Sequence, residues 1–289
     1  MNITIIGVPY DLDQAYIGKG KAPDALLDRG LARRLGELGY TTVLAEMVDL
    51  PESDDDDPLV TRIGRLMTKV GYEVARSRAA GFFPLIVGGD CLVALGALSG
   101  LLDPLNTAVV WVDAHGDFNT PETTISGYLG GMPLACAVGR GLVDLREQCK
   151  LTTPVPERNV VMLGVRDLDA AEEQQLLASS VALVRGPELE RDPAALDTIL
   201  QSLSSLPQLY LHVDIDVLDP VEAPGVDYPA AGGLSLAALS HIVERTVALG
   251  NMAALAITAV NPEKDIDERT ISAALAVIEA ALTQVTSDE

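Results

Sequence analysis

Basic residues are scarce in this sequence of 289 residues. It contains 20 Lys and Arg against 42 Asp and Glu, which gives a formal net charge of −22 at pH 7. Binding to nucleic acid needs a concentrated basic surface that releases counterions, so this balance argues against a nucleic-acid partner. Cysteines are scarce too, and Cys91, Cys136 and Cys149 form an odd, scattered set that indicates no disulfide framework.

Long apolar runs are missing from the sequence as well. None reaches the roughly 18 residues of a membrane span, and the N-terminal segment Asn2–Ile6 has neither the basic start nor the cleavage site of a secretory signal. We therefore expect a cytoplasmic protein without a membrane partner. Hydrophobic residues nevertheless make up 48% of the chain, enough for a large core. The length fits a single domain over residues 1–289, with two small domains as the alternative.

Short runs rich in Val and Ile alternate with longer amphipathic stretches along the chain. This pattern is typical of the α/β class, in which helices cover both faces of a parallel sheet. The predicted strands are Ile3–Val8, Thr41–Leu44, Phe82–Val87, Thr107–Val112, Asn159–Leu163, Val181–Val184, Leu209–Ile215 and Ala253–Val260. The predicted helices include Pro23–Leu38, Leu59–Ala79, Ala194–Leu206, Leu236–Leu249 and Arg269–Gln284. Ligands of such sheets bind beyond the carboxyl ends of the strands, so polar residues that follow a strand are the candidates for function.

Three of the predicted strands end in dense clusters of acidic or metal-ligating residues. The clusters are Gly88-Gly89-Asp90-Cys91, Asp113-Ala114-His115-Gly116-Asp117 and His212-Val213-Asp214-Ile215-Asp216. Residues two apart in an extended chain face the same side, so the acidic residues of each cluster converge if the strand conformation continues. A single Asp-x-Asp pair is usually a turn or a helix cap. Four carboxylates at one place repel one another unless cations lie between them, so the three clusters together favour a divalent metal site with two metals.

The donor types also indicate which metal the site prefers. Carboxylates with one imidazole favour Mn²⁺ or Mg²⁺ over a structural Zn²⁺. Further motifs follow in order along the chain, namely Asn119-Thr120-Pro121, Ser126-Gly127, Gly164-Val165-Arg166-Asp167, Asp214-Ile215-Asp216-Val217-Leu218-Asp219-Pro220, Gly232-Gly233-Leu234 and Val260-Asn261-Pro262. With these motifs, nearly the whole chain resembles the ureohydrolase family of arginases and agmatinases.

The resemblance implies a three-layer αβα sandwich around an eight-stranded parallel sheet. It also implies a binuclear Mn²⁺ centre, two ions per chain, whose bridging hydroxide attacks the guanidinium carbon of an arginine-like substrate. Asp113 and Asp214 match ligands that bridge both metals, and His115 and Asp216 match ligands of one metal. Asp117 matches a ligand of the other metal, and we predict that it is also catalytic. Family members often form trimers or hexamers, so a homo-oligomer is expected.

Residues at the substrate end of the family pattern are present in this sequence. Asn119 and Ser126 match positions that hold the α-carboxylate, and Asp169 and Glu172 match positions that face the α-ammonium group. This set favours an L-amino acid substrate over agmatine. Asp169 and Glu172 alone are equally explained as acidic residues in the first turn of a helix, where the helix dipole favours them.

The sequence departs from the family pattern around the reacting group. Cys91 stands where the family has a metal-binding histidine, and a thiolate suits Zn²⁺, Co²⁺ or Fe²⁺ better than Mn²⁺. We expect that metal site to be weaker or altered, unless Cys91 merely fills space as a small buried residue. Gly130 stands at the position of the proton-carrying histidine, and Ala259 at that of the glutamate that pairs with the guanidinium group.

Two tyrosines are also new at this end of the site. Tyr128 stands where arginases carry Asn, and Tyr228 where the family usually has Thr. Without the charged partner at Ala259, arginine loses about 1.5–3 kcal/mol of binding, and a less basic guanidine loses less. N-hydroxylation lowers guanidine basicity. Cys91 and Tyr128 resemble the branch of the family that hydrolyses N-omega-hydroxy-L-arginine to hydroxyurea and L-ornithine in D-cycloserine biosynthesis, so we expect that substrate.

Several alternatives stay open at the level of the sequence. One alternative is another hydrolase of arginine-like or linear amidines. A second is a catalytically impaired arginase-like pseudoenzyme that binds an amino acid. A related deacetylase fits Asn119 and Ser126 less well. His212 faces the same side of its predicted strand as Asp214 and Asp216, so it either replaces the missing proton relay as a catalytic residue or packs beneath the metal site.

Overall fold

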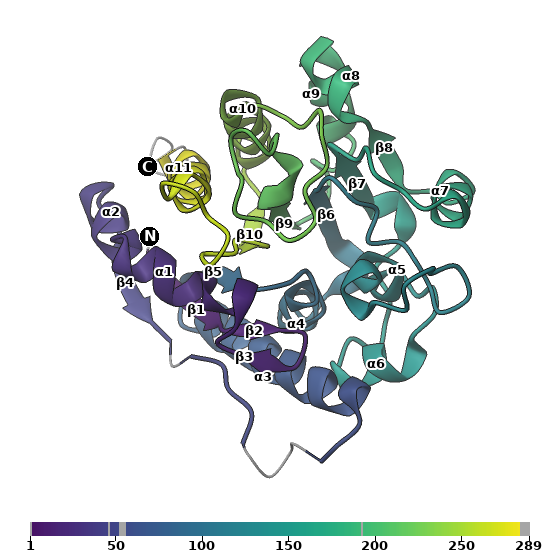
Figure 1. Ribbon diagram of the computed structural model, residues 1–289, viewed down its shortest axis with the longest axis horizontal. Coiled ribbons are helices and arrows are strands. Elements are labelled where there is room, and N and C mark those ends of the chain that lie inside the picture. The colour runs from purple at the N-terminus through teal and green to yellow at the C-terminus, as the bar shows by residue number, and fades with distance from the viewer. Residues whose placement is uncertain (1, 46, 52–55, 192, 284–289) are drawn as a thin grey trace.

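The computed structural model describes residues 2–45, 47–51, 56–191 and 193–283. Its strands are β1 (Asn2–Val8), β2 (Tyr10–Asp11), β3 (Gln14–Ala15), β4 (Thr41–Leu44), β5 (Phe82–Gly88), β6 (Thr107–Val112), β7 (Val160–Leu163), β8 (Ala182–Val184), β9 (Gln208–Asp214) and β10 (Met252–Thr258). Eight of them form one parallel sheet in the order β4-β1-β5-β10-β9-β6-β7-β8 (Figure 1). The predicted sheet is confirmed, whereas the small antiparallel pair β2–β3 was not predicted.

Helices cover both faces of the sheet. They are α1 (Ala22–Asp28), α2 (Leu31–Glu37), α3 (Leu59–Ala79), α4 (Val93–Gly100), α5 (Pro133–Ala137), α6 (Val143–Gln148), α7 (Ala170–Leu177), α8 (Gly186–Arg191), α9 (Pro193–Gln201), α10 (Leu236–Val247) and α11 (Arg269–Thr283). Short 3-10 turns are η1 (Gly18–Lys21), η3 (Pro104–Asn106), η4 (Leu129–Gly131), η5 (Glu157–Asn159) and η6 (Ile215–Val217). Among the described residues, no helix is long and apolar enough to cross a membrane.

Two hydrophobic cores, one on each face, hold the three layers together. Helices α1, α2, α9, α10 and α11 contribute to one core, and α3 to α6 contribute to the other (Figure 1). The central strands supply both cores because their side chains alternate between the two faces, so Val110 and Val112 enter the first core while Val109 and Trp111 enter the second. This double burial explains why the strands read as nearly continuous apolar runs. The predicted αβα sandwich is therefore confirmed.

Some predicted boundaries were wrong. The predicted helix Pro23–Leu38 is two helices, because Gly30 between α1 and α2 has a φ of 87°, which an α-helix cannot contain. The strand predicted to end at Ile215 ends at Asp214, where a 3-10 turn begins. The predicted end of the last helix, Gln284, lies outside the described residues.

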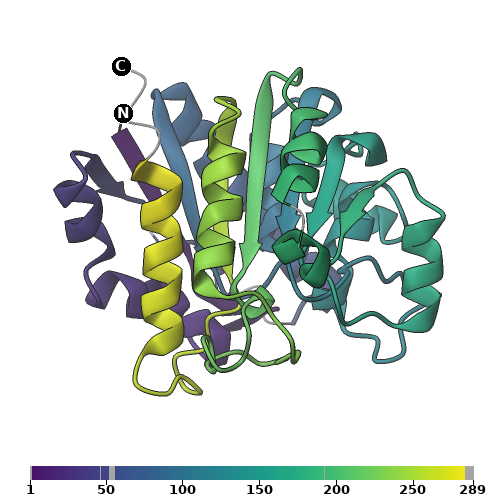
Figure 2. The same cartoon turned by 90° about the horizontal axis from the view of Figure 1, so that it is seen from above.

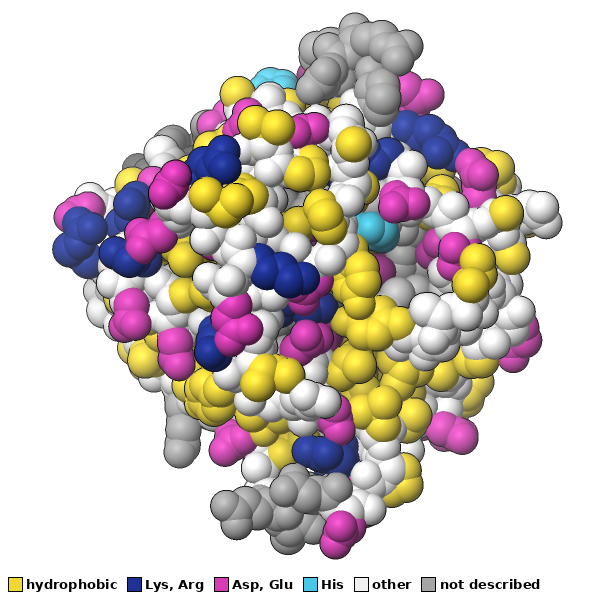
Figure 3. Space-filling view, viewed as in Figure 1, with side chains coloured by type: hydrophobic (Ala, Val, Ile, Leu, Met, Phe, Trp, Pro, Cys, Tyr) yellow, Lys and Arg dark blue, Asp and Glu magenta, His cyan; other side chains and the backbone are white. Residues whose placement is uncertain are grey.

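The loops after the strands gather at one end of the sheet, below the strands in Figure 2. Figure 3 views the molecule as in Figure 1 and shows acidic side chains spread over this face, with basic ones scattered among them. On the described part of this face the basic side chains form no continuous stripe.

Candidate metal centre and substrate cavity

The loops that follow the strands enclose a cavity of about 460 Å³, a size suited to a small ligand. Its walls come from the segments after β1, β5, β6, β7, β9 and β10, where α/β sheets bind their ligands. The cavity brings together the predicted metal and substrate residues Cys91, Asp113, His115, Asp117, Asn119, Ser126, Tyr128, Asp169, Glu172, Asp214, Asp216 and Tyr228. Of the residues assigned to the site, His212 alone does not line it.

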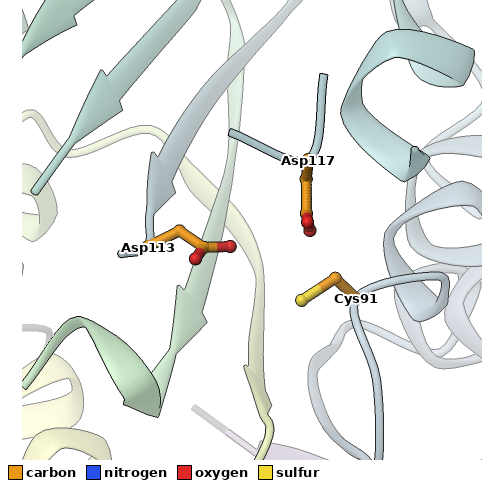
Figure 4. Close-up of side chains that lie close together, drawn as sticks. All are labelled: Cys91, Asp113 and Asp117. Carbon is orange, nitrogen blue, oxygen red and sulfur yellow. The ribbon is translucent and has the colours of Figure 1, made fainter. Parts of the chain in front are cut away.

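One group of potential metal ligands contains the cysteine. Figure 4 shows the side chains of Cys91, Asp113 and Asp117 pointing toward one another. One ligand atom from each lies within 4.8 Å of the other two. The Cys91 thiol also donates a hydrogen bond of 2.9 Å to Oδ2 of Asp214. The thiol is therefore directed at the carboxylates, as a ligand would be, and does not simply fill apolar space.

A second group shares Asp113 with the first. Asp113, His115 and Asp216 also offer ligand atoms within 4.8 Å of one another. His115 Nδ1 lies 3.0 Å from Oδ2 of Asp216 and 3.5 Å from Oδ1 of Asp113. Trp111 Nε1 donates to the other Asp113 oxygen at 3.0 Å and fixes the carboxylate between the two groups. Two adjacent groups that share a carboxylate are the arrangement that a two-metal centre needs.

The convergence does not arise from the extended chain that the sequence analysis assumed. Asp214 is the last residue of β9, and its Oδ1 accepts a hydrogen bond of 2.9 Å from the backbone N–H of Asp216, which lies in the turn η6. Asp117 has a φ of 47°, so the chain after β6 also turns. Tight turns at the strand ends bring these side chains together, because a turn places residues two apart closer than a strand does.

Only part of the charge on the cluster is balanced by His115, because its contacts with Asp113 and Asp216 outweigh burial and raise its pKa to about 12. Burial and the neighbouring carboxylates raise the pKa values of Asp117 and Asp214 well above their usual range. Burial, with Asp216 adding to it, raises the pKa of Asp113 to about 6. One buried carboxylate oxygen, Oδ2 of Asp117, has no hydrogen-bond partner in the described residues. Divalent cations fit this donor set, because they would neutralise the carboxylates and give the orphan oxygen a partner.

In the metal-free protein, the contribution of Asp113 to stability should therefore fall as the pH rises. With a pKa of about 6 against an ordinary value of 3.8, Asp113 binds its proton more tightly in the folded state, so its contribution to the free energy of unfolding falls across this pH window. Between pH 4.5 and pH 7.5 this fall amounts to about 2 kcal/mol, which corresponds to roughly 4–6 °C in Tm for a protein of this size. Thermal unfolding of chelator-treated protein at pH 4.5 and pH 7.5 measures the effect.

The variant Asp113→Asn is the control for this pH dependence, because it cannot titrate at the buried position. Between pH 4.5 and pH 7.5 the Tm of this variant should fall less than that of the wild-type protein. The difference should be most of the contribution assigned to Asp113. Addition of Mn²⁺ should stabilise the wild-type protein more at pH 7.5 than at pH 4.5, since the ligands bind metal in their deprotonated form. Equal falls in Tm for the two proteins would contradict the assigned charge repulsion.

His212 lies beneath the ligands and outside the cavity. The side chain is fully buried and stacks on Trp111 with ring centroids 3.8 Å apart. Its Nδ1 is 2.9 Å from the Tyr210 hydroxyl and its Nε2 is 3.3 Å from the Thr258 hydroxyl. Burial lowers the pKa of His212 to about 3, so the ring is neutral. This geometry matches the packed alternative, and the Thr258 hydroxyl separates His212 from the cavity residues Cys91 and Asp214.

The cavity wall also carries the residues assigned to the amino-acid groups of the substrate. Asp169 and Glu172 form a capping box at the start of α7, and the two Glu172 oxygens accept backbone N–H groups of Phe118 and Asp169. Asn119 Nδ2 donates to Oδ2 of Asp169 at 3.2 Å. The two acidic residues therefore cap the helix and also line the cavity, and their role toward the α-ammonium group stays a prediction.

At the reacting end, the Tyr128 ring fills the space next to Gly130. A Cβ atom built on Gly130 would lie 2.4 Å from Cε1 and 2.7 Å from the hydroxyl of Tyr128. No histidine fits at position 130 while Tyr128 holds this place. Ala259, with a φ of 64°, lines the cavity without any charge, and the Tyr228 ring lies with its centroid 5.6 Å from that of Tyr128.

Lys19 also lines the cavity, although the sequence analysis did not consider it. It lies in η1, on the segment that follows β1, and its side chain is buried. Polar residues that follow a strand are candidates for function, and this criterion found the acidic clusters. Applied to the first strand, it points to this segment as well. The signal was weak because the lysine comes about ten residues after the strand, beyond the pair β2–β3.

The fold and the site together define an α/β protein with a carboxylate-rich candidate metal centre at the strand ends. A sequence model of the arginase family matches residues 1–283. The chain therefore belongs to the arginase family, and the predicted family is confirmed.

Individual relatives match the chain over nearly its whole length. The arginases of Bacillus subtilis (strain 168) and Bacillus caldovelox are each 32% identical to it, over 97% and 96% of both sequences respectively. The crystal structure of arginase from Bacillus cereus has a TM-score of 0.89 at 31% identity and covers 97% of each chain.

Proposed function

We propose that this protein is a metal-dependent hydrolase that cleaves N-omega-hydroxy-L-arginine to hydroxyurea and L-ornithine. The observation that carries the proposal is the position of the Tyr128 ring, which fills the space that a side chain at position 130 would need. The second cavity residue, Ala259, is uncharged. The reacting end has no described carboxylate or histidine at these two positions to pair with a guanidinium group or to carry a proton. The remaining cluster keeps the carboxylates that a metal centre requires.

Two Mn²⁺ ions would be held by the two overlapping groups of ligands. Cys91, Asp113 and Asp117 would hold one ion, and Asp113, His115 and Asp216 the other. Asp214 faces both groups, because it contacts the Cys91 thiol and the backbone of Asp216. Such ions lower the pKa of a water molecule and thereby supply a nucleophile at neutral pH.

Cys91 would bind as a thiolate, which the metal-free site disfavours. Burial and the carboxylates of Asp214, Asp117 and Asp113 raise the pKa of the Cys91 thiol well above its usual range. Metal binding at this group must therefore displace a tightly held proton, and the affinity falls accordingly. We infer that the ion beside Cys91 is the weaker of the two.

The substrate's amino-acid groups would contact four polar residues of the cavity wall. Asn119 and Ser126 would donate to the α-carboxylate, and Asp169 and Glu172 would attract the α-ammonium group. The side chain of an arginine-like amino acid would extend from these residues toward the carboxylate cluster. Water would add to its guanidine carbon there, the C–N bond to the ornithine nitrogen would break, and that nitrogen would take up a proton supplied by the added water.

The test is a comparison of substrates with protein reconstituted with Mn²⁺. N-omega-hydroxy-L-arginine, L-arginine and agmatine are each supplied, and hydroxyurea, urea and ornithine are quantified. We expect hydroxyurea and ornithine in equal amounts, with kcat/KM on hydroxyarginine about tenfold or more above that on arginine, since the lost charged contact costs arginine about 1.5–3 kcal/mol. Asp214→Asn protein prepared in parallel detects a contaminating hydrolase.

Each other outcome of this comparison points to a different function. Turnover of arginine at least as fast as hydroxyarginine would contradict the proposed substrate and make the protein an ordinary arginase. Preference for agmatine would contradict the assignment of the amino-acid end. No product from any substrate, with metal bound, would favour a scaffold that binds an amino acid without hydrolysing it.

A further inference from the structure

We propose that Lys19, hydrogen-bonded to Tyr128, makes the cavity select an uncharged N-hydroxyguanidine over a guanidinium cation. The inference rests on the proposed function, because it assigns the substrate preference of the same site to one lysine. The selection depends on the position and contacts of the Lys19 ammonium group.

The backbone places Lys19 at the cavity with little freedom. Lys19 lies between Gly18 and Gly20 in η1 and is only 4% exposed. A Cβ atom on Gly20 would lie 2.9 Å from the backbone oxygen of Pro9, and one on Gly89 would lie 2.0 Å from that of Tyr10. Close backbone packing thus presses the segment that carries Lys19 against the loop before Cys91.

The contacts of the ammonium group leave one N–H available to a ligand. Lys19 Nζ donates to the Tyr128 hydroxyl at 3.0 Å and lies 3.3 Å from Oδ1 of Asp11. An ammonium group has three N–H donors, and the described residues supply these two acceptors. Because the Tyr128 oxygen accepts from Lys19, its own O–H is free to donate. Both donors lie at the wall of the cavity, where the hydroxyl oxygen of an N-hydroxyguanidine can accept them.

Lys19 also occupies the position that a guanidinium cation would prefer. Its Nζ lies 5.5 Å from the Tyr128 ring centroid and 5.6 Å from that of Tyr228, within the range of cation–π attraction. Lys19 is the one Lys or Arg side chain among the described residues that line the cavity. Burial would lower the pKa of Lys19, but Tyr128 and the carboxylates of Asp90 and Asp11 outweigh it and raise the pKa. The lysine stays charged and repels a second cation.

A purely structural role is the competing explanation. The ion pair with Asp11 joins two residues of the segment after β1. Its loss would lower kcat/KM on all substrates alike. Selectivity between two substrates distinguishes the roles, because a structural tie does not discriminate between a hydroxylated and an ordinary guanidine. The variant Asp11→Asn removes the ion pair but keeps the ammonium group, so it serves as the matched control.

The experiment measures kcat/KM on N-omega-hydroxy-L-arginine and L-arginine for wild type, Lys19→Met, Lys19→Gln, Lys19→Arg and Asp11→Asn. We expect the selectivity for hydroxyarginine to fall at least tenfold in Lys19→Met and Lys19→Gln, mainly through a higher KM for hydroxyarginine. Lys19→Arg keeps the charge and should retain most of the selectivity, and Asp11→Asn should keep the wild-type ratio. Metal content is measured for each protein, since a positioning effect on the metals would lower it.

Failure of this inference is distinct from failure of the proposed function. If wild type hydrolyses hydroxyarginine selectively and the ratio is unchanged in folded Lys19→Met or Lys19→Gln, the inference alone is overturned. A fall of the ratio in Asp11→Asn equal to that in Lys19→Met would also overturn it, because the ammonium group is still present in that variant. If wild type does not prefer hydroxyarginine, both the proposed function and the inference are overturned.

Discussion

Replacing Asp214 with Asn should lower hydrolysis by on the order of 10³-fold, because a charge that faces both metal positions is worth several kcal/mol of transition-state stabilisation. Asp214 is buried, and its two oxygens contact the Cys91 thiol and the backbone N–H of Asp216. An amide has nearly the same shape but one neutral oxygen in place of two charged ones. Steady-state kinetics and elemental analysis of the same preparation measure the effect, and we expect fewer than two metal ions per chain.

The metal-free form of this variant should be at least as stable as the metal-free wild type. Burial and the nearby carboxylates disfavour the charged form of Asp214 when no metal is present, so an amide removes a repulsive group. The control is Asp167→Asn, which removes a charge from an exposed side chain at the cavity wall that belongs to neither ligand group. Full activity of Asp214→Asn, or an equal loss in Asp167→Asn, would contradict the metal assignment.

Replacing Gly89 with Ala should destabilise the protein by about 3 kcal/mol or more, the upper range for overpacking of a tight interior. The new Cβ would lie 2.0 Å from the backbone oxygen of Tyr10 and 3.1 Å from the backbone nitrogen of Gly20. Backbone atoms cannot rotate away as side chains can, so the segment after β1 must shift. Tm should fall by roughly 10 °C, and selectivity should fall with it because this segment carries Lys19.

Gly36→Ala is the matched control for the Gly89 substitution. Gly36 lies in α2, and a Cβ atom there would have no neighbour within 4 Å. Alanine is a better helix former than glycine, so this variant should gain about 0.5–1 kcal/mol. A Gly89→Ala protein with unchanged Tm would show that the packing between the two segments is looser than these distances require.

The sheet and the metal carboxylates could be predicted from the sequence because both depend on short-range patterns. Parallel strands buried on both faces read as apolar runs, and the residues directly after them meet at one edge of the sheet. Asp113 and Asp214 were therefore found at strand ends without knowledge of strand order. The assumed extended geometry was wrong for Asp216, since the turn η6 begins right after Asp214.

The contact between Lys19 and Tyr128 could not be predicted for a different reason. It depends on how loops far apart in the sequence pack together, and such packing leaves little trace in local composition. The contact between Lys19 and Tyr128 joins residues 109 positions apart. Gly130 reads as a missing histidine in the sequence, and only the structure relates its small size to the tyrosine ring beside it.

The two-metal centre is tested most directly by the anomalous X-ray scattering of crystals grown with Mn²⁺. We expect two manganese peaks in the cavity, one in contact with Cys91, Asp113 and Asp117 and the other in contact with Asp113, His115 and Asp216. The peak beside Cys91 should be the weaker at limiting metal, since binding there must displace the thiol proton. No peak, or peaks that leave this cluster empty, would contradict a two-metal hydrolase.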